Sequence, residues 1–142
     1  MLTESAENYL SAILRLEEAE GAAATTSVLA EHLEVARPSV TGMLKRLAAD
    51  GLVTHRRYRG VRLTARGRRA ARRVIRRHRL VETFLVEVLG MSADAVHAEA
   101  HRLEHAISDE VVDRLDLWLG RPARDPHGQP IPAPRRGRDG SD

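Results

Sequence analysis

The apolar positions of the chain recur mainly at helical spacing. Residues 4–21 are apolar on two sides, which is typical of a helix that packs between two neighbours. Thr26 is expected to cap a short helix over 26–33, and a tight turn follows it. Pro38 suits the first turn of a third helix that ends near residue 50. Three helices are therefore predicted in the first part of the chain.

The pattern of residues 52–119 predicts a hairpin and further helices. "LVTHRRYRGVRLT", residues 52–64, has β-formers at both ends and Gly60 at a turn position, as in a two-stranded hairpin. Residues 65–89 then predict one long helix that stops at Gly90. Two more helices are expected, over 93–106 capped by Ser92 and over 109–119 capped by Ser108.

The end of the chain has a different composition. From Gly120 onward it holds five of the six prolines and no apolar period, which predicts an extended tail or linker. The predicted fold is mainly α, with a winged helix-turn-helix domain at 1–72, a helical domain at 73–120 and a Pro/Arg-rich tail or linker at 121–142.

Composition restricts the classes of function. With 142 residues and 42% apolar content, the chain can form one or two small domains. It has no cysteine, so disulfides and thiolate metal ligands are excluded and any metal must be bound through nitrogen and oxygen. The N-terminus lacks a basic region followed by an apolar one, and no apolar run approaches the roughly 20 residues that span a bilayer. We therefore expect a soluble, cytoplasmic protein without a membrane partner.

The charges are unevenly distributed along the chain. Residues 54–79 contain twelve arginines and no acid, whereas residues 80–119 contain nine acids against Arg102 and Arg114. The first stretch suits a polyanion, and the second could hold a cation.

Three short helices followed by a basic hairpin predict binding to double-stranded DNA, with the third helix in the major groove. The polar face of that helix is free of acids, and the hairpin tip is rich in cations that can reach phosphates. The candidate DNA-binding residues are Arg37, Pro38, Ser39, Thr41, Lys45, Arg57, Tyr58 and Arg59.

For the arginines of the following helix, Arg68, Arg69, Arg72 and Arg76, a merely solvated basic surface is as well supported as DNA binding. Gly42 permits close approach to DNA or is simply tolerated within the helix.

Histidines and carboxylates gather on apolar helix faces farther along the chain. In the long helix, His78 and Glu82 lie within the buried stripe, and polar groups on such a face need a partner. A helical hairpin about Gly90 would bring a second helix opposite them. That helix carries His97, His101, Glu104 and His105 beside the stripe Val96, Ala100, Leu103 and Ile107. A single histidine on such a face is more often a satisfied core residue, but so many in facing registers favour a metal site.

Two other functions compete with metal-dependent DNA binding. "HRLEH", residues 101–105, matches H-x-x-E-H, in which both histidines bind zinc and the glutamate is the general base of a peptidase. That chemistry needs a further carboxylate ligand well downstream, and beyond residue 105 Glu110 is the only glutamate. We therefore expect no enzyme. The second alternative is a winged-helix repressor that answers an organic ligand and uses its histidines only structurally.

Several motifs in order along the chain resemble one family. "ENYLSAILRLEE", "VARPSVTGMLKRLAADGLV", "YRGVRLTARG", "RHRLVETFL" and "HAEAHRLEHAISDEV…PHGQPIP" resemble the diphtheria toxin repressor and manganese transport repressor family over about residues 4–132. The resemblance implies a winged helix-turn-helix domain, then a helical metal-binding and dimerisation domain. It also implies a repressor that binds a pseudo-palindromic operator as a dimer when loaded with Mn(II) or Fe(II), and so controls metal homeostasis genes.

The resemblance also implies the ligands. It places a primary metal site on Asn8, His101, Glu104 and His105, and a second on His78, Glu82 and His97. The Asn8 position is Met in the iron branch and Asp in the manganese branch, and the His101 position is Cys or Glu, so this chain matches neither branch. Mn(II) is the first expectation, Fe(II) the second, and Zn(II) is favoured by affinity alone.

The end of the chain supports two further expectations. The stripe Val111, Val112, Leu115, Trp118 and Leu119, with Phe84, Leu85 and Val88, exceeds what a thin domain can cover, which predicts a homodimer. Longer members of the family carry an SH3-like third domain, so this chain is expected to be either a short member or one that stops in the linker to such a domain. Its Pro- and Arg-rich end suits the second alternative.

Overall fold

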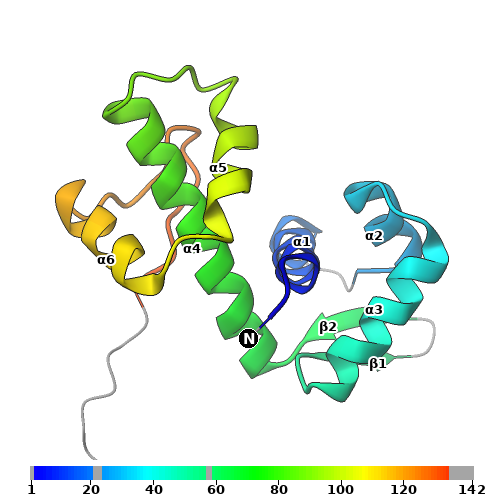
Figure 1. Cartoon of the computed structure of the whole chain (residues 1–142). Helices are drawn as coiled ribbons and strands as arrows, with labels where there is room; N and C mark the ends of the chain where they lie inside the picture. The colour runs from blue at the N-terminus through cyan, green and yellow to red at the C-terminus, as the bar shows by residue number, and fades with distance from the viewer. Residues whose placement is uncertain (1, 21–23, 57–58, 135–142) are drawn as a thin grey trace, which may run out of the picture. The chain divides into compact units, whose positions relative to one another are not determined.

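The chain forms two compact units in the computed structural model, which describes residues 2–20, 24–56 and 59–134 (Figure 1). The first unit is residues 1–72 and the second is residues 73–142. The predicted, mainly α fold class is confirmed, because one two-stranded sheet accompanies helices in the described part. The elements are α1 (Glu4–Glu20), α2 (Thr26–Leu33), α3 (Arg37–Ala49), β1 (Val53–Arg56), β2 (Gly60–Leu63), α4 (Ala65–Glu87), α5 (Val96–Glu104) and α6 (Asp109–Trp118).

The first unit is built around α1, which is buried on both sides as its pattern predicts. Tyr9 and Ala12 on one side and Leu10, Ile13 and Leu14 on the other are all at most 5% exposed. Within the unit α1 contacts α2 and β2, while α3 contacts α2 and β1. An apolar core therefore joins the three helices to the hairpin.

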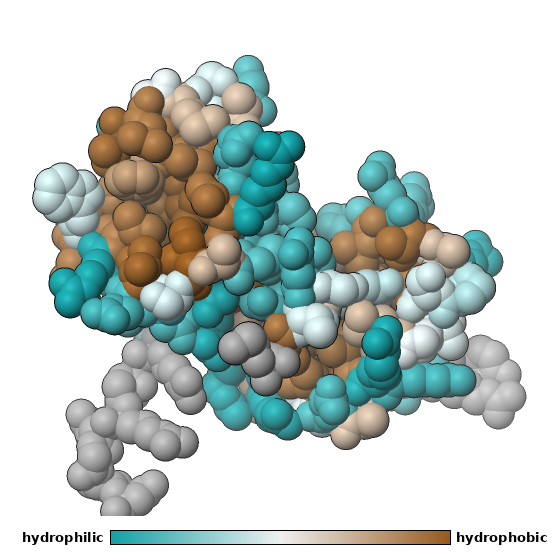
Figure 2. All heavy atoms as spheres, in the orientation of Figure 1, coloured by the Kyte–Doolittle hydropathy of each residue, from teal (hydrophilic) through white to brown (hydrophobic). Residues whose placement is uncertain are grey.

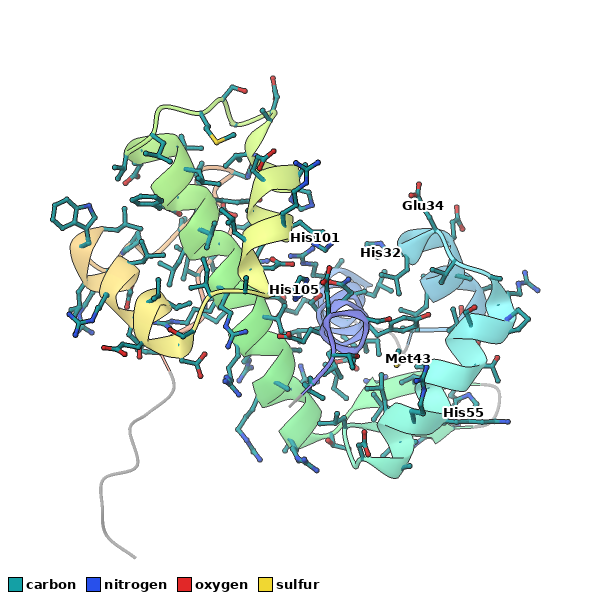
Figure 3. The ribbon with its side chains drawn as sticks, in the orientation of Figure 1. His32, Glu34, Met43, His55, His101 and His105 are labelled. Atoms are coloured by element: carbon teal, nitrogen blue, oxygen red, sulfur yellow. The ribbon has the colours of Figure 1, made fainter. Side chains whose placement is uncertain are left out.

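A tight turn joins α2 to α3, as expected. The cap of α2 is Thr25 rather than the predicted Thr26, because the Thr25 side chain accepts the backbone N–H of Val28 at 3.2 Å. At the other end Glu34, labelled in Figure 3, adopts a left-handed backbone with φ of 55°. That conformation lets Val35 donate its N–H to the carbonyl of Ala30 at 3.0 Å, which closes the helix.

The basic segment forms the predicted hairpin. β1 and β2 are antiparallel, with Val53 opposite Leu63 and Arg56 opposite Gly60. Gly60 has a positive φ of 76°, and a Cβ there would lie 2.4 Å from the carbonyl oxygen of Ala24, so this turn requires glycine. We call residues 53–63 the wing.

The second unit packs α5 and α6 against the rest of α4. One apolar cluster of its core consists of Val81, Leu85, Val96 and Ala100. α5 begins at Val96, later than predicted, because residues 92–95 form a turn in which the Ser92 hydroxyl accepts the N–H of Ala95 at 3.3 Å. Leu103, expected in the stripe, is instead 41% exposed.

Ion pairs hold α6 against α4. Arg76 is buried and donates to Asp113 at 2.8 Å and to Asp116 at 3.1 Å. Asp109 accepts from Arg73 at 2.5 Å and from Arg77 at 2.7 Å. The predicted cap of α6 is confirmed, since the Ser108 hydroxyl accepts the N–H of Val111 at 3.3 Å.

The prediction of an extended tail from Gly120 is wrong for the part of the tail that the structure describes. Residues 123–131 form a closed turn, in which Ile131 donates its N–H to the carbonyl of Ala123 at 2.9 Å and Asp125 donates to Gln129 at 2.8 Å. The buried guanidinium of Arg79 donates to the carbonyl of Pro130 and so ties the turn to α4. The remaining eight residues, 135–142, lie outside the described residues. Among the described helices, none has both the length and the apolar character to cross a membrane.

Candidate metal centre and DNA-binding surface

Three ionisable side chains are buried between α4 and α5 in the second unit. His78 and Glu82 come from α4 and Glu104 from α5, and they are 4%, 1% and 4% exposed. His78 and Glu82 stand one helical turn apart, so their placement in the buried stripe of α4 is as predicted. Buried groups of this kind are stable only with polar or ionic partners.

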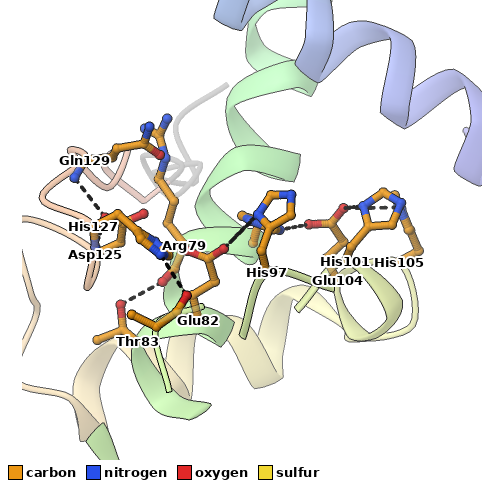
Figure 4. Close-up of polar contacts among 12 residues, drawn as sticks. Arg79, Glu82, Thr83, His97, His101, Glu104, His105, Asp125, His127 and Gln129 are labelled. Atoms are coloured by element: carbon orange, nitrogen blue, oxygen red, sulfur yellow. Dashed lines mark hydrogen bonds and ion pairs between the residues drawn. The ribbon is translucent and has the colours of Figure 1, made fainter. Parts of the chain in front are cut away.

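Glu82 is the centre of one donor group, drawn in Figure 4. Its Oε1 lies 2.6 Å from Nε2 of His78 and 3.1 Å from Nδ1 of His97, and these two nitrogens are 3.1 Å apart. Three potential ligand atoms from α4 and α5 therefore converge on one point. The His97 side chain is 62% exposed, so this point is open to solvent on one side.

Glu104 joins this group to His101 of α5 and to His105, the residue that follows α5. Its Oε2 lies 2.6 Å from Nδ1 of His78, and its Oε1 lies 2.9 Å from Nδ1 of His101 and 3.2 Å from Nε2 of His105. By holding one nitrogen of His78, Glu104 turns the other toward Glu82. This is how a carboxylate outside a metal site commonly orients a histidine ligand.

The proximity of these groups shifts their pKa values. Burial alone would lower the pKa of His78, but its hydrogen bonds to Glu104 and Glu82 outweigh burial and raise it. Burial opposes ionisation of Glu82 as well, yet the hydrogen bond and charge of His78 lower the pKa of this carboxyl to about 2. The Glu82 carboxylate is thus negatively charged at neutral pH, which favours binding of a cation.

A third donor group involves the turn after α6. It was not predicted from the sequence. Nδ1 of His127 lies 3.3 Å from Oε2 of Glu82, and its Nε2 lies 3.0 Å from the carbonyl of Ala93. Asp125 is 6% exposed and accepts the backbone N–H groups of His127 and Gln129 through Oδ1. Its Oδ2 is buried with no hydrogen-bond partner among the described residues.

A local signal for this group was present in "DPHG", residues 125–128. Asp and Pro followed by Gly are typical of a turn, and Gly128 has a φ of 80°. Ligand atoms of Glu82, Asp125 and His127 all lie within 4.8 Å of one another. A histidine beside a turn aspartate is therefore a sequence signal for this donor group.

The donor atoms fit a divalent cation. Ligand atoms held about 2.0–2.2 Å from one ion lie roughly 3 Å from one another. The separations of 2.6, 3.1 and 3.1 Å among Glu82, His78 and His97 match that spacing. Imidazole and carboxylate donors without sulfur suit Mn(II), Fe(II) and Zn(II).

The structure brings the predicted ligands together to different degrees. His78, Glu82 and His97 converge, and His101, Glu104 and His105 form a second, adjoining group. Asn8 lies on α1 in the first unit, so its part in the primary set stays a prediction.

The predicted DNA-binding residues of α3 lie on its exposed face. Val40, Met43, Leu44 and Leu47 face the core of the first unit. The exposed positions include Arg37, Pro38, Ser39, Thr41 and Lys45. Arg59 is exposed at the hairpin, whereas the predictions for Arg57 and Tyr58 lie outside the described residues. This face therefore carries cations and hydroxyls without an acid among the predicted residues.

Two family models match consecutive parts of the chain. The family model "Iron dependent repressor, N-terminal DNA binding domain" matches residues 1–61, and "Iron dependent repressor, metal binding and dimerisation domain" matches residues 64–133. The chain belongs to the iron-dependent repressor family. The resemblance stated from the sequence motifs is thereby confirmed.

Individual iron-dependent repressors are also similar to this chain in sequence. It is 42% identical over 131 residues to the iron-dependent repressor IdeR of Mycobacterium leprae and 41% identical to the diphtheria toxin repressor of Corynebacterium diphtheriae. Each alignment covers 92% of this chain but 56% and 58% of the relative, so the chain spans little more than half the length of these relatives.

Solved structures agree with this placement. A manganese-dependent transcriptional repressor in complex with manganese superposes with a TM-score of 0.85 at 47% identity, over 90% of this chain and 58% of that one. A hypothetical protein from Sulfolobus solfataricus, SSo2273, superposes with a TM-score of 0.74 at 30% identity and is covered over its whole length, with 93% of this chain.

Proposed function

We propose that this protein is a metal-dependent transcriptional repressor. When it holds Mn(II) or Fe(II), it binds a pseudo-palindromic DNA operator as a homodimer and controls metal homeostasis genes. The relatives named above are iron- and manganese-dependent repressors, which supports this proposal. The single observation that carries it is the convergence of His78, Glu82 and His97 in the second unit of a chain whose first unit is a winged helix.

The proposal assigns two sets of ligands. The primary set is Asn8, His101, Glu104 and His105, and the second is His78, Glu82 and His97, to which we add Asp125 and His127. A bound cation supplies a fixed charge that stabilises one arrangement of its ligands. Glu104 contacts His78 of the second set as well as His101 and His105 of the primary set. A shift of Glu104 on metal binding would therefore be transmitted from one set to the other. Zn(II) is the competing ion, since affinity alone favours it.

The DNA side of the proposal uses the exposed face of α3 and the wing. Ser39 and Thr41 would touch base edges, and Arg37 and Lys45 would reach phosphates or guanines. The wing adds Arg57, Tyr58 and Arg59 at the backbone or in the minor groove.

Exposed apolar side chains on the second unit support the homodimer. Figure 2 shows them gathered over α6 and the C-terminal end of α4. Val111, Leu117 and Trp118 on α6 are 46%, 58% and 75% exposed, and Val88 and Leu89 are 46% and 61% exposed. A patch of this kind marks an interface, and a second copy would cover it. Equilibrium sedimentation of the Trp118→Glu variant should show more monomer than the parent, with Arg114→Glu as the exposed control on α6.

The central experiment measures operator binding against metal. Duplexes are first selected from a random pool with Mn(II)-loaded protein, and band shifts are then followed while Mn(II), Fe(II) or Zn(II) is added to chelator-treated protein. We expect binding to require metal and to fall steeply with salt, since cations release counterions from phosphates. Activation by Zn(II) alone would refute the choice of metal but leave the site standing.

Variants locate the response. Glu104→Ala and His105→Ala should lose most of the metal response, and Glu82→Ala should weaken it. Glu110→Ala removes an exposed carboxylate from α6 and should respond as the parent does. Full response of Glu104→Ala and Glu82→Ala to every metal would mean that the ligands are misassigned.

Two alternatives make different predictions. A repressor of an organic ligand would bind its operator equally well with and without chelator. A peptidase would need Glu104 as a general base, but its two oxygens already contact His78, His101 and His105. The geometry therefore favours a binding site over a hydrolytic one.

A further inference from the structure

A buried carboxylate in the first unit joins α1 to the wing. Glu17, near the C-terminal end of α1, is 9% exposed. Its Oε1 accepts the backbone N–H of Leu63 in β2 at 3.1 Å, and its Oε2 accepts from the guanidinium of Arg68 at 2.7 Å. One side chain therefore contacts β2 and the first turns of α4 from a third element.

The contact completes the outer edge of β2. One edge of β2 pairs with β1, and at the other edge Val61 exchanges two backbone hydrogen bonds with Ala24, of 2.8 and 3.2 Å. Leu63 is two residues farther along the strand, so its N–H points to the same outer edge. Glu17 thus occupies the place that a longer third strand would take beside Ala24.

The two groups that donate to Glu17 differ in how they could be satisfied without it. Leu63 is 8% exposed, so without Glu17 its N–H would be shielded from water and unpaired. Arg68 is different, because its side chain is 36% exposed and water can solvate it. The bond to the backbone of the wing is therefore the more consequential half of the contact.

We propose that Glu17 is a positioning residue for DNA binding: it fixes the wing on α1 so that the wing cations meet DNA phosphates together with α3. This inference rests on the proposed function. The wing cations on described residues are Arg56, Arg59 and Arg62, all exposed. Without Glu17, the outer edge of β2 would keep its two backbone bonds to Ala24 and its packing on the core but lose its hydrogen bond to α1, so the wing would be free to shift and its cations would lose their fixed distance from α3.

The test compares Glu17→Ala and Glu17→Gln with Glu18→Ala, in the full chain loaded with Mn(II). Glu18 is the neighbouring carboxylate of α1 and is exposed, so its removal controls for charge. Glutamine keeps an oxygen that can accept the Leu63 N–H, so this variant should lie between the parent and Glu17→Ala. Two quantities are measured: hydrogen exchange of the Leu63 and Val61 amides, and the salt dependence of binding to random-sequence duplex DNA.

We expect Glu17→Ala to speed exchange at Leu63 by at least about tenfold while Val61, bonded to Ala24, changes little. The slope of log affinity against log salt should become shallower by about 0.9 for each phosphate contact that the wing loses. A residue that only stabilises the fold would speed both amides equally and leave the salt slope of the folded protein unchanged.

Three results would overturn the inference. Folded Glu17→Ala could bind DNA with the affinity and salt slope of Glu18→Ala, or Leu63 and Val61 could exchange equally fast. Where Glu17→Ala does not fold, the Glu17→Gln variant decides: exchange at Leu63 and a salt slope equal to those of Glu18→Ala would overturn the inference, because an amide should hold Leu63 and Arg68 less firmly than the carboxylate does. Failure of the parent itself to bind any duplex would instead refute the proposed function.

Discussion

The two units of the chain differ in where they keep their charges. Residues 1–72 contain twelve Lys and Arg and eight Asp and Glu, whereas residues 73–142 contain eleven and twelve. In the described part of the first unit, the buried polar side chains are Ser11 and Glu17. The second unit buries Arg76, His78, Arg79, Glu82, Thr83, Glu104, Asp116 and Asp125.

The difference shows two ways to build a small domain. The first unit has an apolar core and presents its cations on the surface, so its stability is largely independent of ions. The second unit has a thin apolar core between α4, α5 and α6, and it places ionised groups where they must be neutralised by partners. Its stability should therefore respond to charge mutations, pH and metal far more than that of the first unit.

The largest effect on stability is expected from loss of the buried ion pair between α4 and α6. Replacing Arg76 with Ala would leave Asp116, which is 8% exposed, without its buried partner. We expect a loss of about 3–5 kcal/mol in the free energy of unfolding, typical of an uncompensated buried charge. Urea titration followed by hydrogen exchange of the backbone amides of α4, α5 and α6 reports on the second unit directly.

Arg114→Ala is the matched control on α6. Arg114 pairs with Glu110 at 3.2 Å, and the two side chains are 77% and 75% exposed. Its loss should cost about 0–1 kcal/mol. Equal costs for Arg76→Ala and Arg114→Ala would mean that burial of an ion pair does not make the second unit more sensitive to its loss.

A smaller effect is expected from pH in protein treated with chelator. The pKa of Glu82 falls from 4.5 to about 2 on folding, so the stability it contributes is present above about pH 4.5 and is lost as pH falls toward 2. The pKa of His78 is raised above 6.5, so its contribution is complete below 6.5 and is lost as pH rises through the raised value. The second unit should thus be most stable between about pH 4.5 and 6.5, with a loss on the order of 3 kcal/mol on the acid side.

The same urea titrations, repeated across pH, check this window. Glu82→Gln should remove most of the loss on the acid side, and His78→Gln should remove the loss on the alkaline side. Stability that stays constant across the window, or that rises steadily from pH 6 to about 8 in the parent, contradicts the assignment of these groups.

The smallest effect concerns Gly42 on the exposed face of α3. A Cβ at this position would meet nothing within 4 Å, so no packing inside the protein requires glycine. Gly42→Ala should raise the free energy of unfolding of the first unit by up to about 1 kcal/mol. Operator affinity should nevertheless fall or its sequence preference change, because the new methyl group faces DNA in the proposed complex.

Ala48→Gly provides the reverse substitution on an exposed position of the same helix. It should destabilise the first unit by a similar amount and leave operator preference unchanged. Thermal unfolding and band shifts measure both quantities. Unchanged operator binding by Gly42→Ala would mean that the glycine is merely tolerated.

The fold was predictable where local chemistry and packing agree. Ser108 caps α6 as expected because Asp109 and Glu110 follow it directly and favour a helix N-terminus. Ser92 has the same side chain but lies just after Gly90, where the chain reverses direction. The helix that follows begins only at Val96, which is fully buried in the core. The sequence shows both serines, but only the tertiary structure decides which one precedes a helix.

The candidate site divides in the same way. His78 and Glu82 could be predicted because helical spacing places them on the buried stripe of α4. Asp125 and His127 could not be placed beside Glu82, because the turn that carries them is held by distant contacts, from Arg79 to Pro130 and from His127 to Ala93. No periodicity in the proline-rich segment reports such contacts.

The uneven exposure of the donor groups has a kinetic consequence. Glu82 and Glu104 are almost fully enclosed, whereas the His97 and His101 side chains are 62% and 47% exposed. A competing ligand from solution could therefore replace the imidazoles one after another and withdraw an ion while the helices stay folded. Occupancy of such a site would follow the free ion concentration at the speed of ligand exchange rather than at the much slower speed of global unfolding.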